Sequence, residues 1–246
     1  MRSDDLRTEW DTIACPVCDG NEFRHLFDKA GQAFVRCADC GLTLINPRPP
    51  LARIRDHYDA AYSAAYTRKA QAKIIRARKR VARIGRDGGR WLDVGCSAGF
   101  VVKAALEAGF EAWGVDIETD GIAYGRDTLG LARLACGELE SQHYPDAHFD
   151  VISAYDVIEH VPDLNRFVAE LARLLAPQGV LDIGTPDIGH WRVPHALAQW
   201  NELKPSEHLY YFNRNTLGRL LARHGLHIVR KRWALKPALK VLVEHT

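Results

Sequence analysis

WLDVGCSAGF, residues 91–100, predicts an apolar strand that runs into a glycine-bearing loop and then into the start of a helix. Small residues at such a turn let a ligand approach the backbone closely. From this stretch onward, short apolar strands alternate with segments of helical periodicity, which is typical of a parallel sheet with helices on both faces. We therefore expect an α/β protein with a doubly wound, mostly parallel sheet of seven strands.

The alternation also predicts where the elements lie. Strands are expected at residues 91–95, 111–117, 131–138, 149–156, 179–185, 226–233 and 240–245, and helices at residues 100–109, 121–130, 162–176 and 215–225. The helix at 162–176 is well delimited, because Pro162 lies at its start, Pro177 follows its end and its apolar residues recur at helical spacing.

The carboxyl ends of the first two strands predict a cofactor site, because ligands of doubly wound sheets bind beyond these ends. Gly95, Ser97 and Gly99 would face the ligand, and Asp116 is placed to accept hydrogen bonds from ribose hydroxyls. The dinucleotide fingerprint G-x-G-x-x-G, counted from Gly95, fails at its second and third glycines. Asp93 would repel a pyrophosphate and suits a polar or cationic group. We therefore expect a nucleoside-bearing cofactor other than a dinucleotide.

Four cysteines near the N-terminus predict a metal site. Cys15 and Cys18 form one C-x2-C pair, and Cys37 and Cys40 form a second pair after eighteen intervening residues, a spacing typical of zinc. Four thiolates would complete a tetrahedron and leave no position for a substrate, so the zinc would be structural. Two disulfides or four unmetallated thiols are the alternatives, and disulfides are disfavoured in a chain without an export signal. Short strands on either side of Gly31 complete the pattern of a small zinc ribbon.

Residues 51–90 predict a mostly helical segment that is rich in basic side chains, with Ile74, Ala77, Val81 and Ile84 on one face. Its basic residues include Arg68, Lys69, Lys73, Arg76, Lys79, Arg80 and Arg83. They form either a solvated amphipathic face or a surface for phosphate groups. Three tyrosines spaced by four residues either pack in the core or wall a ligand cavity: Tyr58, Tyr62 and Tyr66.

Composition limits the class of protein. The chain has 246 residues, 47% of them hydrophobic, and a formal net charge of +2, which is too mild to require a nucleic-acid partner. No apolar run is long enough to span a membrane, and the first residues show no secretory signal, so we expect a cytoplasmic protein. We expect a zinc-binding module at residues 1–50, a helical linker at 51–88 and a sheet domain at 89–246.

Over residues 90–230 the sequence resembles the class I S-adenosylmethionine-dependent methyltransferases, which have a Rossmann-like sheet. LDVGCSAG (92–99) is similar to their first motif, with Ser97 where glycine is usual, and FDVISAYDVIEHV (149–161) and LLAPQGVLDIGTPD (174–187) are similar to the motifs of their fourth and fifth strands. The resemblance implies S-adenosylmethionine as cofactor, held by Asp93, Gly95, Ser97, Gly99, Asp116, Ile117, Glu138, Leu139 and Asp156. Glu138 would lie beside the adenine, and Asp156 would either help to bind the methionine end or cap a helix.

The sequence is similar in particular to a subgroup that includes sugar C-methyltransferases and carries a four-cysteine zinc module in front and an EHLYYF segment behind, here at residues 207–212. This resemblance implies a catalytic histidine at His208, with Glu207 orienting its imidazole or binding substrate. His160 is the rival base, and each histidine has a structural role as its alternative. Residues 187–205 interrupt the alternation and form either a lid over the acceptor or an excursion packed by its own tryptophans.

Three functions follow from these patterns. The leading one is a zinc-containing methyltransferase that acts on a small polar acceptor, such as a nucleotide-linked sugar or a natural-product intermediate. An RNA methyltransferase is the alternative, but the chain has no marked basic excess and no aromatic platform for single strands. The third is a non-catalytic binding module, because the fold alone does not specify chemistry. The sequence favours no particular oligomeric state.

Overall fold

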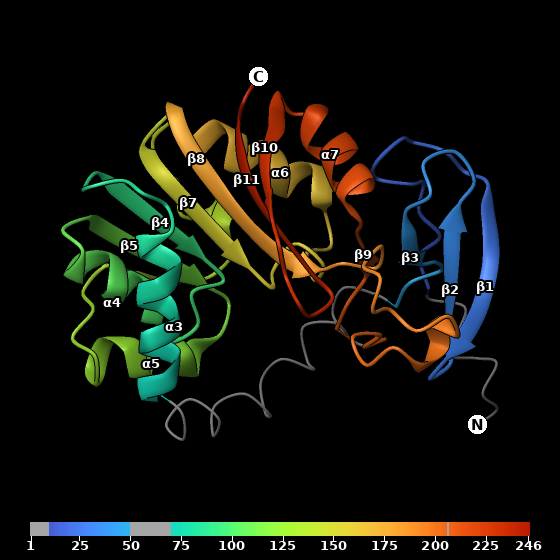
Figure 1. Ribbon diagram of the computed structural model, residues 1–246, viewed down its shortest axis with the longest axis horizontal. Coiled ribbons are helices and arrows are strands. Elements are labelled where there is room, and N and C mark those ends of the chain that lie inside the picture. The colour runs from blue at the N-terminus through green and yellow to red at the C-terminus, as the bar shows by residue number, and fades with distance from the viewer. Residues whose placement is uncertain (1–9, 50–69, 206) are drawn as a thin grey trace.

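The computed structural model describes residues 10–49, 70–205 and 207–246. The strands of its larger sheet are β4 (Arg90–Val94), β5 (Glu111–Asp116), β6 (Leu134–Cys136), β7 (Phe149–Tyr155), β8 (Leu175–Pro186), β10 (Leu226–Arg232) and β11 (Ala238–His245). They are ordered β10-β11-β8-β7-β4-β5-β6 (Figure 1). Neighbours from β8 to β6 are parallel, whereas β11 pairs antiparallel with β8 and β10. The expected doubly wound sheet of seven strands is confirmed.

Helices cover both faces of this sheet (Figure 1). One face is covered by α3 (Ala70–Ala82), α4 (Phe100–Glu107) and α5 (Thr119–Asp127), and the other by α6 (Leu164–Leu174) and α7 (Arg214–Ala222). Alternate strand residues enter the two layers, because side chains of a strand point to opposite faces. Trp91 packs in the first layer, whereas Leu92 and Val94 pack in the second. The buried layers hold the carboxyl ends of β4, β5 and β7 in fixed positions.

A second sheet joins the N-terminal module to the rest of the chain. It has the order β1-β2-β3-β9, with β1 (Phe23–Lys29), β2 (Gln32–Cys37), β3 (Thr43–Ile45) and β9 (Tyr210–Tyr211). The pairs Thr43–Tyr211 and Leu44–Tyr210 set the register of β3 against β9. Asn165 Nδ2 also donates to the Pro16 carbonyl oxygen at 3.0 Å. The module is thus bound to the larger domain by backbone pairing, side-chain contacts and a shared apolar core.

The segment at residues 187–205 is anchored on the N-terminal sheet. Trp200 is 4% exposed and packs in one cluster with Phe34, Ile45 and Tyr211. Trp191, by contrast, is 72% exposed. One tryptophan therefore fixes the segment while the other lies at the surface.

The described part of the predicted basic helix is α3. α3 buries Ile74, Ala77 and Val81, as its periodicity predicts. The positions of Tyr58, Tyr62, Tyr66, Arg68 and Lys69 lie outside the described residues. Across the described ranges, no helix is both long and apolar enough to cross a membrane.

Candidate active site

The loop after β4 has a backbone that accommodates only small residues. Gly95 and Gly99 adopt left-handed φ values of 69° and 75°. A Cβ at Gly95 would lie 2.2 Å from Val157 Cγ2, and one at Gly99 would lie 2.6 Å from Leu131 Cδ1. Ser97, at the position where glycine is usual, also has a left-handed φ, of 50°. The loop thus keeps the sharp turn that the glycine pattern predicts.

Asp116, at the end of β5, lies against this loop. Its Oδ2 accepts a hydrogen bond from the Ser97 N–H at 2.7 Å, and its Oδ1 accepts one from the Glu118 N–H at 2.9 Å. These donors orient the carboxylate and leave a lone pair on each oxygen for ribose hydroxyls. The next residue, Ile117, is 49% exposed and offers an apolar surface to a nucleobase. The two residues fit the nucleoside half of S-adenosylmethionine.

Asp93 is a buried carboxyl group on β4, with 3% exposure. The Ser153 hydroxyl donates to its Oδ1 at 2.5 Å, and Trp91 Nε1 donates to the Ser153 hydroxyl at 2.9 Å. Burial raises the pKa of Asp93 to about 7; the Ser153 hydrogen bond and the charge of Arg80 oppose this shift, and the charge of Asp116 adds to it. A cationic group nearby would favour the ionised form. The ammonium group of S-adenosylmethionine fits this requirement.

The remaining expected cofactor positions follow β7 and β6. Asp156 has a left-handed φ of 58°, and its N–H donates to the Gly184 carbonyl oxygen at 2.7 Å. Its side chain reaches solvent but is crowded by protein, and this desolvation raises its pKa. The helix-cap alternative for Asp156 is wrong, because Asp163 caps α6. Glu138 is exposed and Leu139 is buried just after β6. Because β7, β4, β5 and β6 are parallel neighbours, the expected cofactor positions all lie at the carboxyl-terminal ends of these strands, on one side of the sheet.

The structure brings His160 and His208 together, with ring centroids 4.6 Å apart. His160 Nδ1 lies 2.8 Å from the Glu207 carbonyl oxygen, and His208 Nδ1 lies 2.9 Å from the Glu202 carbonyl oxygen. A carbonyl oxygen only accepts hydrogen bonds, so each Nδ1 carries a proton and each neutral ring has its lone pair on Nε2. The expectation that Glu207 orients the His208 imidazole is wrong, because His208 Nδ1 bonds to Glu202 and the Glu207 carbonyl oxygen orients His160 instead. The Glu207 carboxylate pairs with Lys204 at 3.4 Å.

Both imidazoles are neutral at physiological pH. Burial lowers the pKa of His208 to about 3, and repulsion from His160 and Lys204 acts in the same direction. Burial also lowers the pKa of His160 to about 4, although Glu207 opposes this shift. Neutral imidazoles of this kind accept a hydrogen bond from a hydroxyl group or ligate a cation.

Glu159, which the sequence reasoning did not single out, completes this cluster. It is 1% exposed; the Thr185 hydroxyl donates to its Oε2 at 2.9 Å, and its Oε1 has no hydrogen-bond partner within the described part of the chain. Ligand atoms of Glu159, His160 and His208 lie within 4.8 Å of one another. Burial raises the pKa of Glu159 to about 8, and the charge of Asp156 adds to the shift. The signal in the sequence was an acid inside the apolar stretch VIEHV, because glutamate is rarely buried without a partner.

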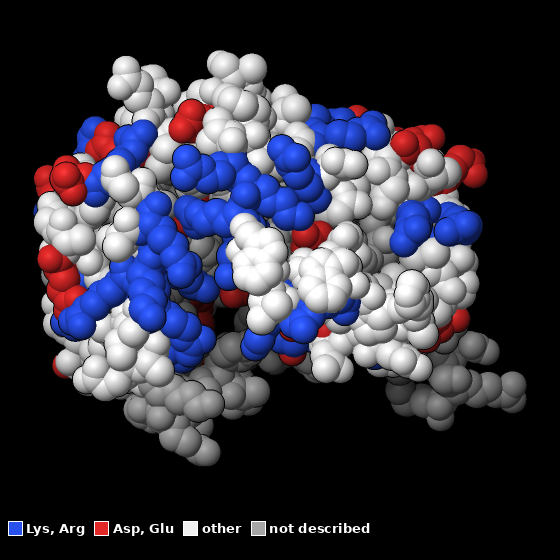
Figure 2. Space-filling view, in the orientation of Figure 1, with Lys and Arg blue, Asp and Glu red and all other residues white. Residues whose placement is uncertain are grey.

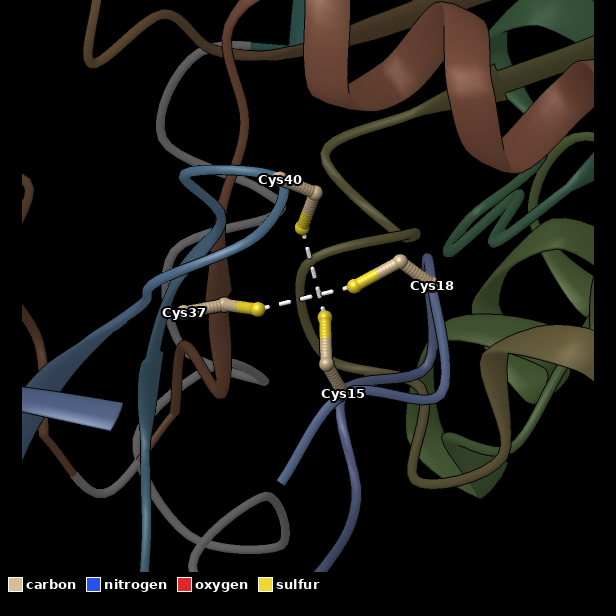
Figure 3. Close-up of side chains that lie close together, drawn as sticks. All are labelled: Cys15, Cys18, Cys37 and Cys40. Atoms are coloured by element: carbon tan, nitrogen blue, oxygen red, sulfur yellow. Dashed lines mark hydrogen bonds between the residues drawn. The ribbon is translucent and has the colours of Figure 1, made fainter. Parts of the chain in front are cut away.

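The four N-terminal cysteines converge on one point (Figure 3). Cys15 Sγ lies 3.4 Å from Cys40 Sγ, and Cys18 Sγ lies 3.5 Å from Cys37 Sγ. A disulfide needs about 2.05 Å, whereas sulfurs bound at about 2.3 Å around a tetrahedral zinc lie roughly 3.8 Å apart. Burial raises the pKa of Cys15, and it raises that of Cys40 to about 11, which a bound cation would offset. The donor set fits a zinc ion without an open position.

Comparison with known proteins identifies the family. Residues 66–231 match the methyltransferase domain family. The chain belongs to this family. The methyltransferase is 27% identical over 176 residues to the ubiquinone biosynthesis O-methyltransferase of Rhodopseudomonas palustris strain TIE-1. This match covers 63% of this chain and 69% of the relative. It is 29% identical over 151 residues to the ubiquinone biosynthesis O-methyltransferase of Nitrobacter winogradskyi, and this match covers 53% of this chain and 57% of the relative.

Solved structures share the fold of this methyltransferase. The Burkholderia thailandensis 1,6-didemethyltoxoflavin-N1-methyltransferase, with bound 1,6-didemethyltoxoflavin and S-adenosylhomocysteine, matches with a TM-score of 0.61 and 18% identity over 91% of this chain and 99% of that chain. A TehB-like methyltransferase from Corynebacterium glutamicum matches with a TM-score of 0.56 and 19% identity over 75% of this chain and 98% of that chain. Family and fold together confirm an S-adenosylmethionine-dependent methyltransferase.

Proposed function

We propose that this methyltransferase moves a methyl group from S-adenosylmethionine to a hydroxyl group of a small polar acceptor. The observation that carries the proposal is the convergence of Glu159, His160 and His208 beyond the ends of β7 and β8. The O-methyltransferases among the relatives support transfer to oxygen, and the fold neighbour with bound 1,6-didemethyltoxoflavin supports a small acceptor. A sugar or natural-product acceptor is the finer proposal, supported by the four-cysteine module and the EHLYYF segment.

Different residues of the site would serve the steps of an in-line displacement, in which the protein mainly positions the reactants and removes a proton. S-adenosylmethionine would supply the methyl group from its positively charged sulfur, with the carbon–sulfur bond breaking, and would leave as the neutral thioether S-adenosylhomocysteine. Asp116 would accept hydrogen bonds from the ribose, and Asp93 would favour the ammonium group. The acceptor hydroxyl would donate to Nε2 of His208 or His160, which takes the proton as the carbon–oxygen bond forms.

Glu159 would assist this proton transfer. The pKa of His208 is low in the buried site, so the free imidazole is a weak base. An ionised carboxylate favours the charged form of a neighbouring base. Glu159 lies within 4.8 Å of the imidazole ligand atoms. Because burial raises its pKa to about 8, its ionised form, which predominates above about pH 8, would stabilise the imidazolium as it appears.

We also propose a structural zinc at Cys15, Cys18, Cys37 and Cys40. The convergence of the sulfurs and the absence of an open position support this role. The zinc would hold the turn between β2 and β3, and β3 pairs with β9, which begins two residues after His208. The zinc would therefore contribute to the active site only through the position of β9.

Calorimetry and a methyl-transfer assay test the proposal. We expect the zinc-loaded protein to bind S-adenosylmethionine, and Asp116→Ala to weaken that binding by about tenfold or more, because a carboxylate hydrogen bond is lost. Asp127→Asn, at an exposed acid at the end of α5, is the matched control and should bind normally. A folded, zinc-loaded protein that does not bind S-adenosylmethionine would refute the proposal. Transfer of label to nitrogen or carbon but not to oxygen would refute the choice of acceptor atom.

A further inference from the structure

A basic recess lies beside the proposed active site. It has a volume of about 50 Å³ and lies where the ends of β7 and β8 meet α3, β10 and β11. Figure 2 shows Lys and Arg side chains gathered on this face over α3 and over β10 and β11. The cations that line the recess are Arg80, Arg83, Arg232 and Lys240.

Acidic side chains neutralise only part of this charge. Arg232 Nη1 contacts both carboxylate oxygens of Asp182, at 3.0 and 2.9 Å. Considering the described ranges alone, no carboxylate comes within the 4.0 Å ion-pair distance of Arg80, Arg83 or Lys240. Asp156 also lines the recess, so the four cations of the recess face two carboxylates and the net charge remains positive.

Two further observations show that the recess favours a negatively charged group. Arg232 Nη2 is a buried donor that finds no hydrogen-bond partner in the described part of the chain. Burial lowers the pKa of Lys240, and repulsion from Arg80 and Arg83 acts in the same direction, while Asp156 opposes it. An anion would provide the acceptor for Arg232 and reduce the repulsion among the cations.

We propose that this recess binds the phosphate group of a phosphorylated small-molecule acceptor. The inference rests on the proposed function and names the substrate class of the same site. A phosphate monoester carries nearly two negative charges at neutral pH and three acceptor oxygens. It therefore suits Arg80, Arg83 and Lys240, which have no carboxylate within ion-pair distance among the described residues, better than a single carboxylate does. Arginine also binds phosphate oxygens through parallel N–H donors.

The recess is connected to the proposed catalytic cluster. Thr185 lines the recess and donates to Glu159 at 2.9 Å, and Asp156 lines it directly after β7. An acceptor held here by its phosphate would extend its uncharged part toward Glu159 and His208. The phosphate would then position the acceptor without taking part in the displacement. The recess is too small for a run of nucleic-acid phosphates, which would need an extended basic track.

The test is a titration of the zinc-loaded full chain with inorganic phosphate by calorimetry at constant ionic strength. We expect Arg83→Gln and Lys240→Gln each to weaken phosphate binding about tenfold, because each removes a charged hydrogen-bond donor. Arg78→Gln is the matched control, since Arg78 lies on the same helix but pairs with Glu107 at 2.7 Å. It should change phosphate affinity less than about twofold.

A parallel titration with S-adenosylmethionine separates this proposal from the proposed function. We expect equal cofactor affinity in the wild type and the three variants. The proposal that the recess binds phosphate would be overturned if phosphate affinity is unchanged in Arg83→Gln and Lys240→Gln, or is reduced equally in Arg78→Gln, even if the cofactor binds normally. Phosphate binding as expected without any cofactor binding would overturn the proposed function instead. Tight binding of a single-stranded oligoribonucleotide that all three substitutions weaken equally would assign this surface to nucleic acid and overturn the small-molecule proposal.

Discussion

Replacing Asp93 with asparagine should stabilise the protein at neutral pH. Burial raises the pKa of Asp93 from 3.8 to about 7, a shift of about three units. Each unit corresponds to about 1.4 kcal/mol, so keeping this carboxylate ionised in the folded state costs about 4 kcal/mol. Asparagine has the same shape and keeps an oxygen for the Ser153 hydroxyl, but it carries no charge. We therefore expect Asp93→Asn to gain up to about 4 kcal/mol of unfolding free energy at pH 8.

The difference in unfolding free energy between Asp93→Asn and the wild type should increase with pH. Below pH 4 both the folded and the unfolded carboxyl groups of Asp93 are protonated, so Asp93→Asn should gain nothing. Between pH 4 and pH 7 the unfolded chain releases its proton while the folded chain retains it, so wild-type stability falls as the pH rises. Above pH 7 the difference between wild type and variant should be constant. Proton release from other groups, including the cysteines, affects both proteins equally and cancels in this difference.

Urea unfolding followed by tryptophan fluorescence at pH 5, 6, 7 and 8 measures the difference. It should grow by about 1.4 kcal/mol per pH unit up to pH 7 and then level off. The exposed-acid variant Asp127→Asn should stay within about 0.5 kcal/mol of wild type at every pH. A difference for Asp93→Asn that does not depend on pH would falsify the assignment of a buried, costly carboxylate. The same variant should bind S-adenosylmethionine about tenfold more weakly, because it lacks the charge that favours the ammonium group.

Three other substitutions test separate parts of the structure. Ser97→Gly should retain cofactor binding and change stability by less than about 1 kcal/mol, because relief of the left-handed φ is offset by greater freedom of the unfolded chain; loss of binding in calorimetry would contradict this. Cys15→Ser should reduce bound zinc from about one ion per chain to nearly none in a colorimetric assay and lower the melting temperature, whereas Cys136→Ser should leave zinc content unchanged. His208→Gln should lower kcat about 100-fold or more with little change in cofactor affinity, measured beside the exposed control His227→Gln; equal activity of the two variants would exclude His208 as the base.

Elements specified by local pattern were predictable from the sequence. The glycine loop, the helix that begins at Leu164 and the four cysteines each depend on residues that are close together in the chain. Their spacing therefore contained the information needed to predict them. The doubly wound, mostly parallel sheet of seven strands is also confirmed, whereas the order of its strands was not predicted.

Contacts between distant segments were not predictable in the same way. β9 has only two residues, and its partner β3 lies near the other end of the chain, so no local periodicity indicates their pairing. The cluster around Glu159 brings together Thr185, His160 and His208, which come from three separate segments of the chain. The observed role of Glu207 differs from the expected one for the same reason. Its carbonyl oxygen, rather than its carboxylate, accepts a hydrogen bond from the imidazole of His160. Such roles depend on packing, which sequence spacing does not specify.

The pairing of β3 with β9 has a consequence for how this protein can be divided or recombined. A cut near residue 50 would separate the cysteine module from Tyr210 and Tyr211, which form the fourth strand of its own sheet. A donor module grafted from another enzyme would need an edge complementary to these two tyrosines. The module therefore cannot serve as an interchangeable cassette, and functional chimaeras should arise only when the tyrosine segment is exchanged together with it.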